Sequence, residues 1–177
     1  GTGDFLRELG QSLGFTVHEV PAFSLNGELV SSSRIRRKIR EGDVKEAAEL
    51  LGRPFEISGE VVRGENRGKG LGFPTSNLEV PPEMVDIKPG VYACLARLGS
   101  ETWNAVTNIG YRPTFGDTLE SPRIEAHLLD FSRDLYGQKL SLAFIERLRA
   151  ERKFSQVDDL IEQVRKDIAL AREILQG

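Results

Sequence analysis

The chain has 177 residues, of which 39% are hydrophobic and 29% are charged, and its net charge is −3. These values are typical of a soluble globular protein, and the acidic balance argues against a general nucleic-acid binder, which usually carries a basic surface. No apolar run approaches the roughly 18 residues of a membrane span, and residues 1–4 show no signal-peptide pattern. A single cysteine, Cys94, fits a reducing compartment, so we expect a cytoplasmic protein.

The N-terminal residues predict a helix followed by a strand. Residues 3–14 carry apolar side chains at helical spacing, and Gly14 is a plausible C-cap. The apolar side chains are those of Phe5, Leu6, Leu9 and Leu13. Residues 15–20 alternate as a strand does, with His18 on the less apolar side. A helix and strand of this kind belong to an α/β sheet, and the rest of that sheet is absent from this sequence.

Two short helices are predicted next. Ser33 is a suitable N-cap for a helix over residues 34–40, and Asp43 for a helix over residues 44–51 that ends at Gly52. The first of these helices carries basic side chains that could bind a polyanion. Acidic residues follow at once, so a solvated helix face is the alternative. The basic residues are Arg34, Arg36, Arg37, Lys38 and Arg40.

From Arg53 the pattern changes to short segments of period two, separated by turns. The predicted strands cover residues 55–62, 90–98, 102–108, 123–131 and 139–148. Five or six strands in roughly 95 residues, with no helix between them, predict an antiparallel barrel or sandwich. Cys94 is expected to be a small core residue of one of these strands.

The last predicted element is a helix that lies against the β structure. Ser155 is its expected N-cap, with Asp158 three residues on, as in a capping box. An apolar stripe follows at helical spacing, which indicates core packing. The stripe consists of Val157, Leu160, Ile161, Val164, Ile168, Ala171 and Leu175.

A glycine-rich segment, residues 64–72, follows the first of these strands. Its four glycines leave the backbone amides open to a ligand, as in a phosphate-binding loop. A mobile loop without a ligand has the same glycine-rich pattern and is the alternative. The segment is not a Walker loop, because Lys69 is followed by Gly70 rather than by Ser or Thr. It is not a dinucleotide fingerprint either, because no long helix follows the glycines and Pro74 disfavours one.

The end of this segment, Gly72-Phe73-Pro74-Thr75-Ser76-Asn77, resembles the Gly-x-Pro-Thr-Ala-Asn signature of riboflavin kinases, with Ser76 at the usual Ala position. Four further motifs follow in the family's order, at residues 108–115, 125–131, 134–137 and 152–154. Upstream, residues 31–36 resemble the closing motif of the adenylyltransferase module in bacterial bifunctional riboflavin kinase/FAD synthetases. The resemblance covers nearly the whole chain.

The resemblance implies a mainly β fold, a six-stranded antiparallel Greek-key barrel with a C-terminal helix. The kinase domain would cover residues 53–177, and residues 1–52 would be a Rossmann-like α/β remnant of the FMN adenylyltransferase module. The implied reaction moves the γ-phosphate of ATP to riboflavin and gives FMN and ADP, with Mg²⁺ as the metal. The expected partners are therefore small molecules, with neither nucleic acid nor membrane among them.

Phosphate and metal ligands are expected around residues 68–77. The amides of Gly68, Gly70 and Gly72, with the Lys69 side chain, could surround the phosphates, and ordinary loop solvation is the alternative. A second group contains Thr75 and Asn77, whose side chains leave the same face of an extended segment. Their hydroxyl and amide oxygens suit Mg²⁺, although such residues often bond to their own backbone. By the resemblance, these two bind the metal and the phosphates, and the Ser76 departure is expected to be neutral.

The expected catalytic residue is Glu125. Alternation places Arg123, Glu125 and His127 on one face of a strand, which on pattern alone indicates an outer, wetted face. The resemblance implies instead that Glu125 is the general base for the ribityl 5′-hydroxyl of riboflavin. His127 is expected to be a structural partner rather than a second base.

The flavin needs a flat apolar slot with a few polar anchors. Each residue that the resemblance assigns to this slot also suits a turn or packing position. The assigned residues are Asn108, Pro113, Thr114, Tyr136, Arg152 and Phe154.

The N-terminal motif belongs by resemblance to a second activity. Ser32, Ser33 and Arg36 would hold ATP phosphates at a helix N-terminus in the adenylyltransferase. The only methionine is Met84, so we expect a piece of a longer protein that also makes FAD, and no FAD synthesis from this chain. The alternatives are a non-catalytic flavin- or nucleotide-binding barrel, and a nucleic-acid module that uses the basic helix.

Overall fold

The computed structural model describes residues 3–64, 70–81, 84–112 and 121–176. The chain divides into two compact units, Gly1–Ser31 and Ser32–Gly177, and each is described by itself. No helix among the described residues is long and apolar enough to cross a membrane.

The first unit contains a helix and a small hairpin. Helix α1 covers Gly3–Leu13 and is followed by Gly14 at a φ of 77°, the left-handed conformation of a C-cap. Strands β1, Ser24–Leu25, and β2, Glu28–Leu29, pair across a tight turn. The predicted strand over residues 15–20 is wrong, since these residues are in no strand. Alternation alone does not make a strand, because a β ladder needs a partner to accept and donate its hydrogen bonds. The Rossmann-like remnant is therefore not confirmed.

Two helices open the second unit. Helix α2 covers Ser32–Glu41 and helix α3 covers Val44–Leu51. The Asp43 carboxylate accepts a hydrogen bond from the Glu46 amide at 3.2 Å, which confirms the predicted cap of α3, and Gly52 ends this helix at a φ of 71°. The predicted N-cap at Ser33 is wrong, because α2 already includes Ser32 and Ser33 lies in its first turn.

Both of these helices pack with the barrel. Ile39 of α2 and Val44 and Ala47 of α3 belong to its hydrophobic core cluster. Arg40 also donates to the Asp86 carboxylate at 2.8 Å. The compact unit thus begins at Ser32, upstream of the predicted module boundary after residue 52, and that boundary remains a prediction about the origin of the segment.

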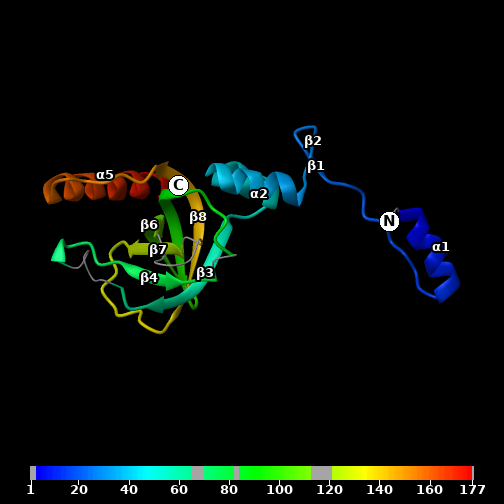
Figure 1. Cartoon of the computed structure of the whole chain (residues 1–177), viewed down its shortest axis with the longest axis horizontal. Helices are drawn as coiled ribbons and strands as arrows, with labels where there is room; N and C mark the ends of the chain where they lie inside the picture. Colours follow the sequence, from blue (N-terminus) through cyan, green and yellow to red (C-terminus); the bar gives the residue numbers. More distant parts are fainter. Residues whose placement is uncertain (1–2, 65–69, 82–83, 113–120, 177) are drawn as a thin grey trace. The chain divides into compact units, whose positions relative to one another are not determined.

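The rest of the chain forms a closed, antiparallel six-stranded barrel (Figure 1). Its strands are β3, Phe55–Val62; β4, Ser76–Glu79; β5, Gly90–Leu98; β6, Glu101–Arg112; β7, Ser121–Leu128; and β8, Lys139–Arg149. They close in the order β3-β4-β7-β6-β5-β8. Strands β5, β6 and β7 are consecutive neighbours, and β8 returns beside β5, which is a Greek key. The predicted barrel is confirmed.

Alternate residues of each strand point into the barrel and form the core. Tyr92 and Phe144 lie edge to face there, with ring centroids 5.3 Å apart. Cys94 is fully buried, as the sequence predicts, and burial raises the pKa of its thiol to about 12. The inward-facing side chains of the remaining strands include Ile57, Val61, Leu78, Ile109, Ile124, Leu140 and Leu142.

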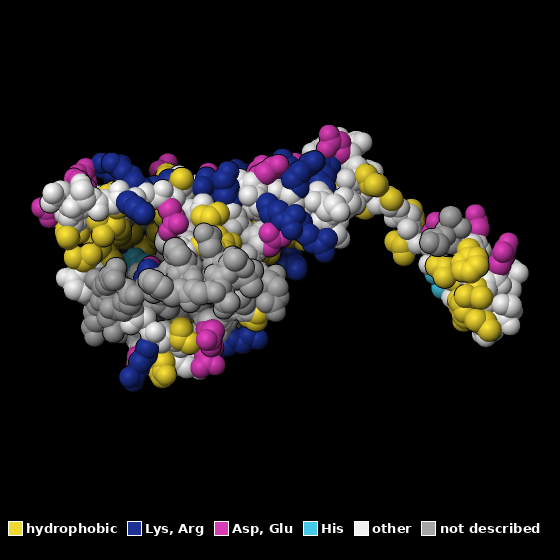
Figure 2. All heavy atoms as spheres, viewed as in Figure 1, with side chains coloured by type: hydrophobic (Ala, Val, Ile, Leu, Met, Phe, Trp, Pro, Cys, Tyr) yellow, Lys and Arg dark blue, Asp and Glu magenta, His cyan; other side chains and the backbone are white. Residues whose placement is uncertain are grey.

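Helix α5, Val157–Leu175, lies across the outer face of the barrel (Figure 1). Its second half packs on β5 and β6, where Ala171 and Ile168 join a cluster with Val91 and Val106. The predicted capping box at Ser155 is wrong: the N-cap is Gln156, and no side chain caps the helix. Figure 2 shows hydrophobic side chains gathered beside this helix, at the left of the view.

Candidate active site

A cavity of about 320 Å³ lies between α5 and the outer face of the barrel. Its floor is formed by β5, β6 and β7, and its sides by residues 71–75 and by the connection from β8 to α5. The lining contains both polar and apolar side chains. The polar lining includes Thr75, Asn108, Arg123, Glu125, His127, Arg149, Glu151, Arg152 and Asp167. The apolar lining consists of Leu71, Phe73, Val91, Val106, Phe154, Leu160, Ile161 and Val164.

The β-sheet register brings three predicted residues together beside the cavity. Glu125 of β7 lies directly opposite Asn77 of β4 on one side and Asn108 of β6 on the other. Directly paired residues of antiparallel strands project from the same face, so all three side chains leave the outer face of the barrel. Thr75, just before β4, lines the same cavity as Glu125. Residues 75–77, 108 and 125 are far apart in the sequence and meet because β4 and β6 both pair with β7.

The Glu125 carboxylate has a defined partner. The Arg123 guanidinium donates to its Oε1 atom from the same face of β7. The Glu125 side chain is only 20% exposed, although it lies on the outside of the barrel. The pattern-based expectation of an outer face is confirmed, but this part of that face is covered rather than open to solvent.

His127 joins the segment before β4 to β7. Its Nδ1 atom lies 2.7 Å from the Pro74 carbonyl oxygen, and its ring meets the Phe73 ring edge to face at 6.0 Å. These two contacts position residues 73–75 beside Glu125. The prediction that His127 is a structural partner agrees with this arrangement.

The side-chain amide of Asn77 lies against the backbone of Gly64. A Cβ atom at residue 64 would overlap the Asn77 amide where it lies now, so a side chain there would displace this amide. Asn77 does not line the cavity, but its pairing with Glu125 places it next to the residues that do. The start of the glycine-rich segment thus makes a close approach to Asn77 that the absence of a Cβ atom permits.

The side-chain oxygens of Thr75 and Asn77 suit a hard cation that takes its remaining ligands from water or a substrate. Thr75 and Asn77 offer a hydroxyl and an amide oxygen, as Mg²⁺ takes when substrate phosphates and water complete its shell. No group of three or more His, Cys, Asp or Glu residues that could hold a metal ion occurs in the described part of the chain.

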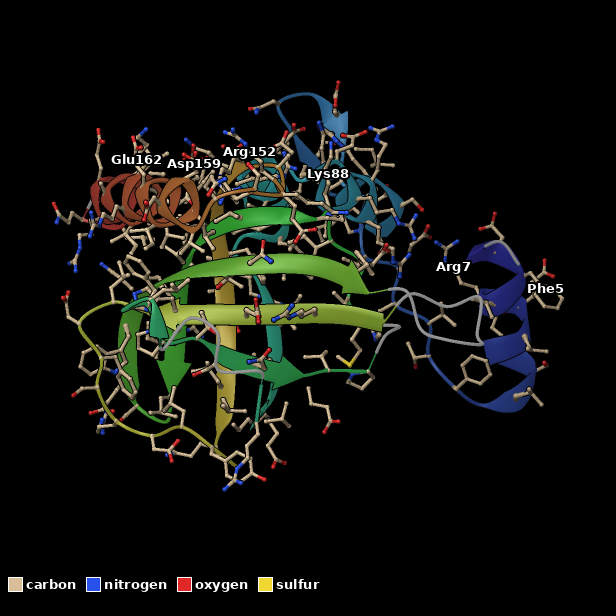
Figure 3. The ribbon with its side chains drawn as sticks, turned by 60° about the vertical axis from the view of Figure 1, so that its left-hand side comes forward. Phe5, Arg7, Lys88, Arg152, Asp159 and Glu162 are labelled. Carbon is tan, nitrogen blue, oxygen red and sulfur yellow. The ribbon has the colours of Figure 1, made fainter. Side chains whose placement is uncertain are left out.

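The part of the lining that α5 contributes is mostly apolar and faces the barrel; we call it the apolar slot. Leu160, Ile161 and Val164 face it from the helix. The Arg152 guanidinium lies over the Phe154 ring, 5.2 Å from its centroid, and both residues line the cavity. Figure 3 shows Arg152 beside the first turns of α5, near Asp159 and Glu162. Asn108, which pairs with Glu125 across the sheet, donates to the Glu151 carboxylate at 3.1 Å.

Some predicted residues lie elsewhere. Tyr136 does not line the cavity; its ring is 55% exposed and lies under the Arg63 guanidinium at 4.9 Å. Ser32, Ser33 and Arg36 lie in α2 and are not part of the lining. Gly70 and Gly72 flank Leu71, which reaches the cavity. Gly68, Lys69, Pro113 and Thr114 lie outside the described residues.

Sequence reasoning missed the buried ion pair between Arg149 and Asp167, which also lines the cavity. The available signal was the position of Asp167, three residues after Val164 and four before Ala171. That spacing puts a carboxylate on the apolar stripe of the last helix, where a charge needs a partner.

Comparison with known proteins identifies related chains. The family described as Flavokinase, riboflavin kinase, matches residues 51–175. A bifunctional riboflavin kinase/FMN adenylyltransferase from Bacillus subtilis is 42% identical over 139 residues, which cover 78% of this chain and 44% of that protein. One of the same name from Pseudomonas fluorescens is 37% identical over 174 residues, 98% of this chain and 55% of that protein. The chain spans about half the length of these curated relatives.

Solved structures agree on the fold. A Streptococcus pneumoniae crystal structure described as a macrolide-efflux protein has a TM-score of 0.85 at 32% identity, covering 97% of this chain and 55% of that one. A riboflavin kinase from Trypanosoma brucei has a TM-score of 0.53 at 21% identity, covering 70% of this chain and 81% of that one, and supports the fold alone. The match over residues 51–175 and the polar cavity within that span lead to one conclusion: the chain belongs to the riboflavin kinase family.

Proposed function

We propose that this chain is a riboflavin kinase, which transfers the γ-phosphate of ATP to the 5′-hydroxyl of riboflavin and releases FMN and ADP. The observation that carries the proposal is the shared cavity of Thr75 and Glu125, which continues into an apolar slot under α5. In this proposal the phosphate site and the flavin site meet at one carboxylate, that of Glu125. Family membership supports the same reaction.

Glu125 is the proposed general base. Its carboxylate would accept the proton of the ribityl hydroxyl as that oxygen attacks the γ-phosphorus. In a loose transition state the proton leaves late, so the carboxylate mainly orients the hydroxyl. The Arg123 guanidinium fixes the direction of this carboxylate.

Thr75, Asn77 and the backbone of residues 68–72 are the proposed phosphate site. When bound, Mg²⁺ would neutralise charge on the β- and γ-phosphates, and Thr75 and Asn77 would be its protein ligands. His127 keeps Thr75 in place through the Pro74 carbonyl. The hydroxyl and amide groups thereby align the nucleotide with Glu125.

The apolar slot is the proposed flavin site. Phe154 and the α5 side chains offer a flat surface for the ring system, and Asn108 and Arg152 are polar anchors. Tyr136, Pro113 and Thr114 remain proposed flavin contacts by resemblance alone. A ring bound in this slot would exclude water from the hydroxyl that reacts.

The parent protein is proposed to be bifunctional and cytoplasmic, with an FMN adenylyltransferase module to which residues 1–52 belong. Alignment with the Pseudomonas fluorescens protein over 98% of this chain supports the assignment of the N-terminal residues. Ser32, Ser33 and Arg36 would act in that second reaction. We expect this chain to produce no FAD from FMN and ATP.

The decisive experiment measures FMN formation from riboflavin, ATP and Mg²⁺ by chromatography. We expect turnover by the wild type and a fall of about 10²- to 10⁴-fold in Glu125→Gln, the range of a lost general base. Glu56→Gln is a matched control, because Glu56 also pairs with an arginine, Arg97, on the outer barrel surface but lies outside the cavity.

The outcomes separate the alternatives. Flavin binding without turnover by the wild type would favour a non-catalytic binding barrel. Steeply salt-dependent binding of oligonucleotides would favour a nucleic-acid module. Equal rates in Glu125→Gln and Glu56→Gln would show that the base lies elsewhere.

A further inference from the structure

The buried network behind the cavity has no role in the mechanism above. Asp167 of α5 is only 4% exposed. The Arg149 Nε atom donates to both of its carboxylate oxygens, at 2.9 and 3.0 Å, and Nη2 donates to Oδ2 at 2.7 Å. Gln163, one helical turn earlier, donates to Asp167 Oδ1 at 3.0 Å. An ion pair at this depth is costly unless each polar atom has a partner, and here the carboxylate has several.

The hydrogen bonds of the Arg149 guanidinium are made within the protein. Nε and Nη2 donate to Asp167, and the third nitrogen, Nη1, donates to the Ala150 carbonyl oxygen at 2.9 Å. Every guanidinium nitrogen thus has at least one partner in this network, which indicates a structural role. The pair lines the cavity as part of its wall.

The network joins three parts of that wall. Arg149 is the last residue of β8 and pairs with Val91 of β5. Asp167 and Gln163 belong to α5, which supplies Leu160, Ile161 and Val164 to the slot. The Ala150 carbonyl begins the connection that carries Arg152 and Phe154. The barrel, the helix and this connection are therefore fixed to one another through a single guanidinium.

Because every group held in this way borders the apolar slot, we propose that Arg149, Asp167 and Gln163 form a positioning network that sets the width of the flavin site. The network acts on flavin affinity and not on the phosphoryl-transfer step, since Glu125 and Thr75 are held by Arg123 and His127 instead. This inference rests on the proposed function, because it takes the slot under α5 as the flavin site.

A second ion pair on the same helix provides the control. Arg172, near the C-terminal end of α5, donates to both Asp130 oxygens, at 2.7 and 2.8 Å. The Asp130 side chain is 69% exposed, and neither residue lines the cavity. Asn suits the positive φ of 58° at residue 130, so Asp130→Asn removes this pair with little backbone strain.

The test compares steady-state kinetics of the wild type, Asp167→Asn, Arg149→Lys and Asp130→Asn. For Asp167→Asn we expect the KM for riboflavin to rise about tenfold, with kcat within about threefold and the KM for ATP within about twofold, as when an interaction used for binding is lost. Arg149→Lys should also raise the KM for riboflavin, because Lys lacks the planar guanidinium that binds both Asp167 oxygens. Asp130→Asn should leave the KM for riboflavin within about twofold.

A milder variant covers the case in which Asp167→Asn does not fold. Gln163→Ala leaves the ion pair in place and removes one hydrogen bond to Asp167, so we expect the KM for riboflavin to rise about two- to threefold. Thermal denaturation establishes that each variant is folded. An unchanged KM in every folded variant would overturn the inference, as would a fall in kcat alone or an equal rise in Asp130→Asn.

Titration of riboflavin fluorescence separates this inference from the proposed function. A wild-type chain that binds riboflavin but makes no FMN would refute the kinase proposal. In that case weaker riboflavin binding by Asp167→Asn would support the inference, and equal binding would overturn it. A wild-type chain that neither binds riboflavin nor forms FMN would overturn both.

Discussion

The two faces of β7 are buried in different ways, although the same alternation of side chains produces both. On the inner face, Ile124 is 1% exposed and packs with residues of every neighbouring strand in the barrel core. On the outer face, Glu125 lines a cavity together with side chains of α5 and of residues 71–75, which come from remote parts of the sequence. The inner face is defined by strand pairing, and the outer one by how later elements cover the barrel.

Burial and ion pairing do not by themselves separate a site from a surface. Glu56 on β3 pairs with Arg97 and is 25% exposed, which is close to the 20% of Glu125 with Arg123. Only Glu125 lies in a cavity with other polar groups and an apolar slot. Convergence of side chains from several strands is the property that distinguishes the two carboxylates.

The largest effect should come from the inner face. Ile124→Ala removes a fully buried side chain next to Glu125, and we expect a loss of about 2–5 kcal/mol in the free energy of unfolding, the range for such core truncations. Chemical denaturation measures it. Val157→Ala, at an exposed position of α5, should cost about 0.5 kcal/mol or less. A loss at Ile124 no larger than at Val157 would contradict the packing described here.

The next effect should come from the close approach of Gly64 and Asn77. Gly64→Ala places a Cβ atom where the Asn77 amide lies, so the amide must move. We expect kcat/KM for ATP to fall about tenfold or more, with small changes in stability, since a displaced ligand weakens the phosphate site.

A double-mutant cycle with Asn77→Ala shows whether the two changes act together. If Gly64→Ala acts by displacing Asn77, the double variant should be little worse than Asn77→Ala alone. Fully additive losses would show that Gly64 acts independently of this amide.

A smaller effect is expected at His127, which holds the segment before β4. His127→Phe keeps an aromatic ring for Phe73 but loses the hydrogen bond to the Pro74 carbonyl. One such bond is worth about 0.5–1.5 kcal/mol, so we expect the KM for ATP to rise roughly two- to tenfold. His127→Asn, which can still donate to that carbonyl, should recover part of the loss. If kcat collapses in both variants, His127 takes part in the chemistry and is not only a structural partner.

The sequence predicted the inner face better than the outer one. Period-two alternation located most barrel strands. Glu125 and Thr75 were predicted as site residues only because their motifs resemble those of riboflavin kinases. Alternation gave no information on which outer residues α5 covers, because that depends on contacts between distant elements. The short strand β4 and the start of α5 were also poorly defined, since neither Ser155 nor Asp158 makes the predicted cap.

The smallest effect should come from the end of β7, where Asp130 pairs with Arg172 in the open. The hydrogen bond from Arg172, and then its charge, lower the pKa of the Asp130 carboxyl. A pKa lowered by folding contributes stability above the unfolded-state value of about 3.9, and that contribution is lost as the pH falls through the folded-state pKa.

Thermal denaturation of the wild type and Asp130→Asn measures this contribution. The wild type should be slightly more stable near neutral pH, and the difference should shrink as the pH falls below about 4 and vanish below the folded-state pKa. Added salt should shrink the difference at neutral pH, because both side chains are exposed and their attraction is screened. A difference that persists at low pH would show that the charge of Asp130 is not the source of its stabilisation, because the carboxyl is then protonated in both the folded and the unfolded state.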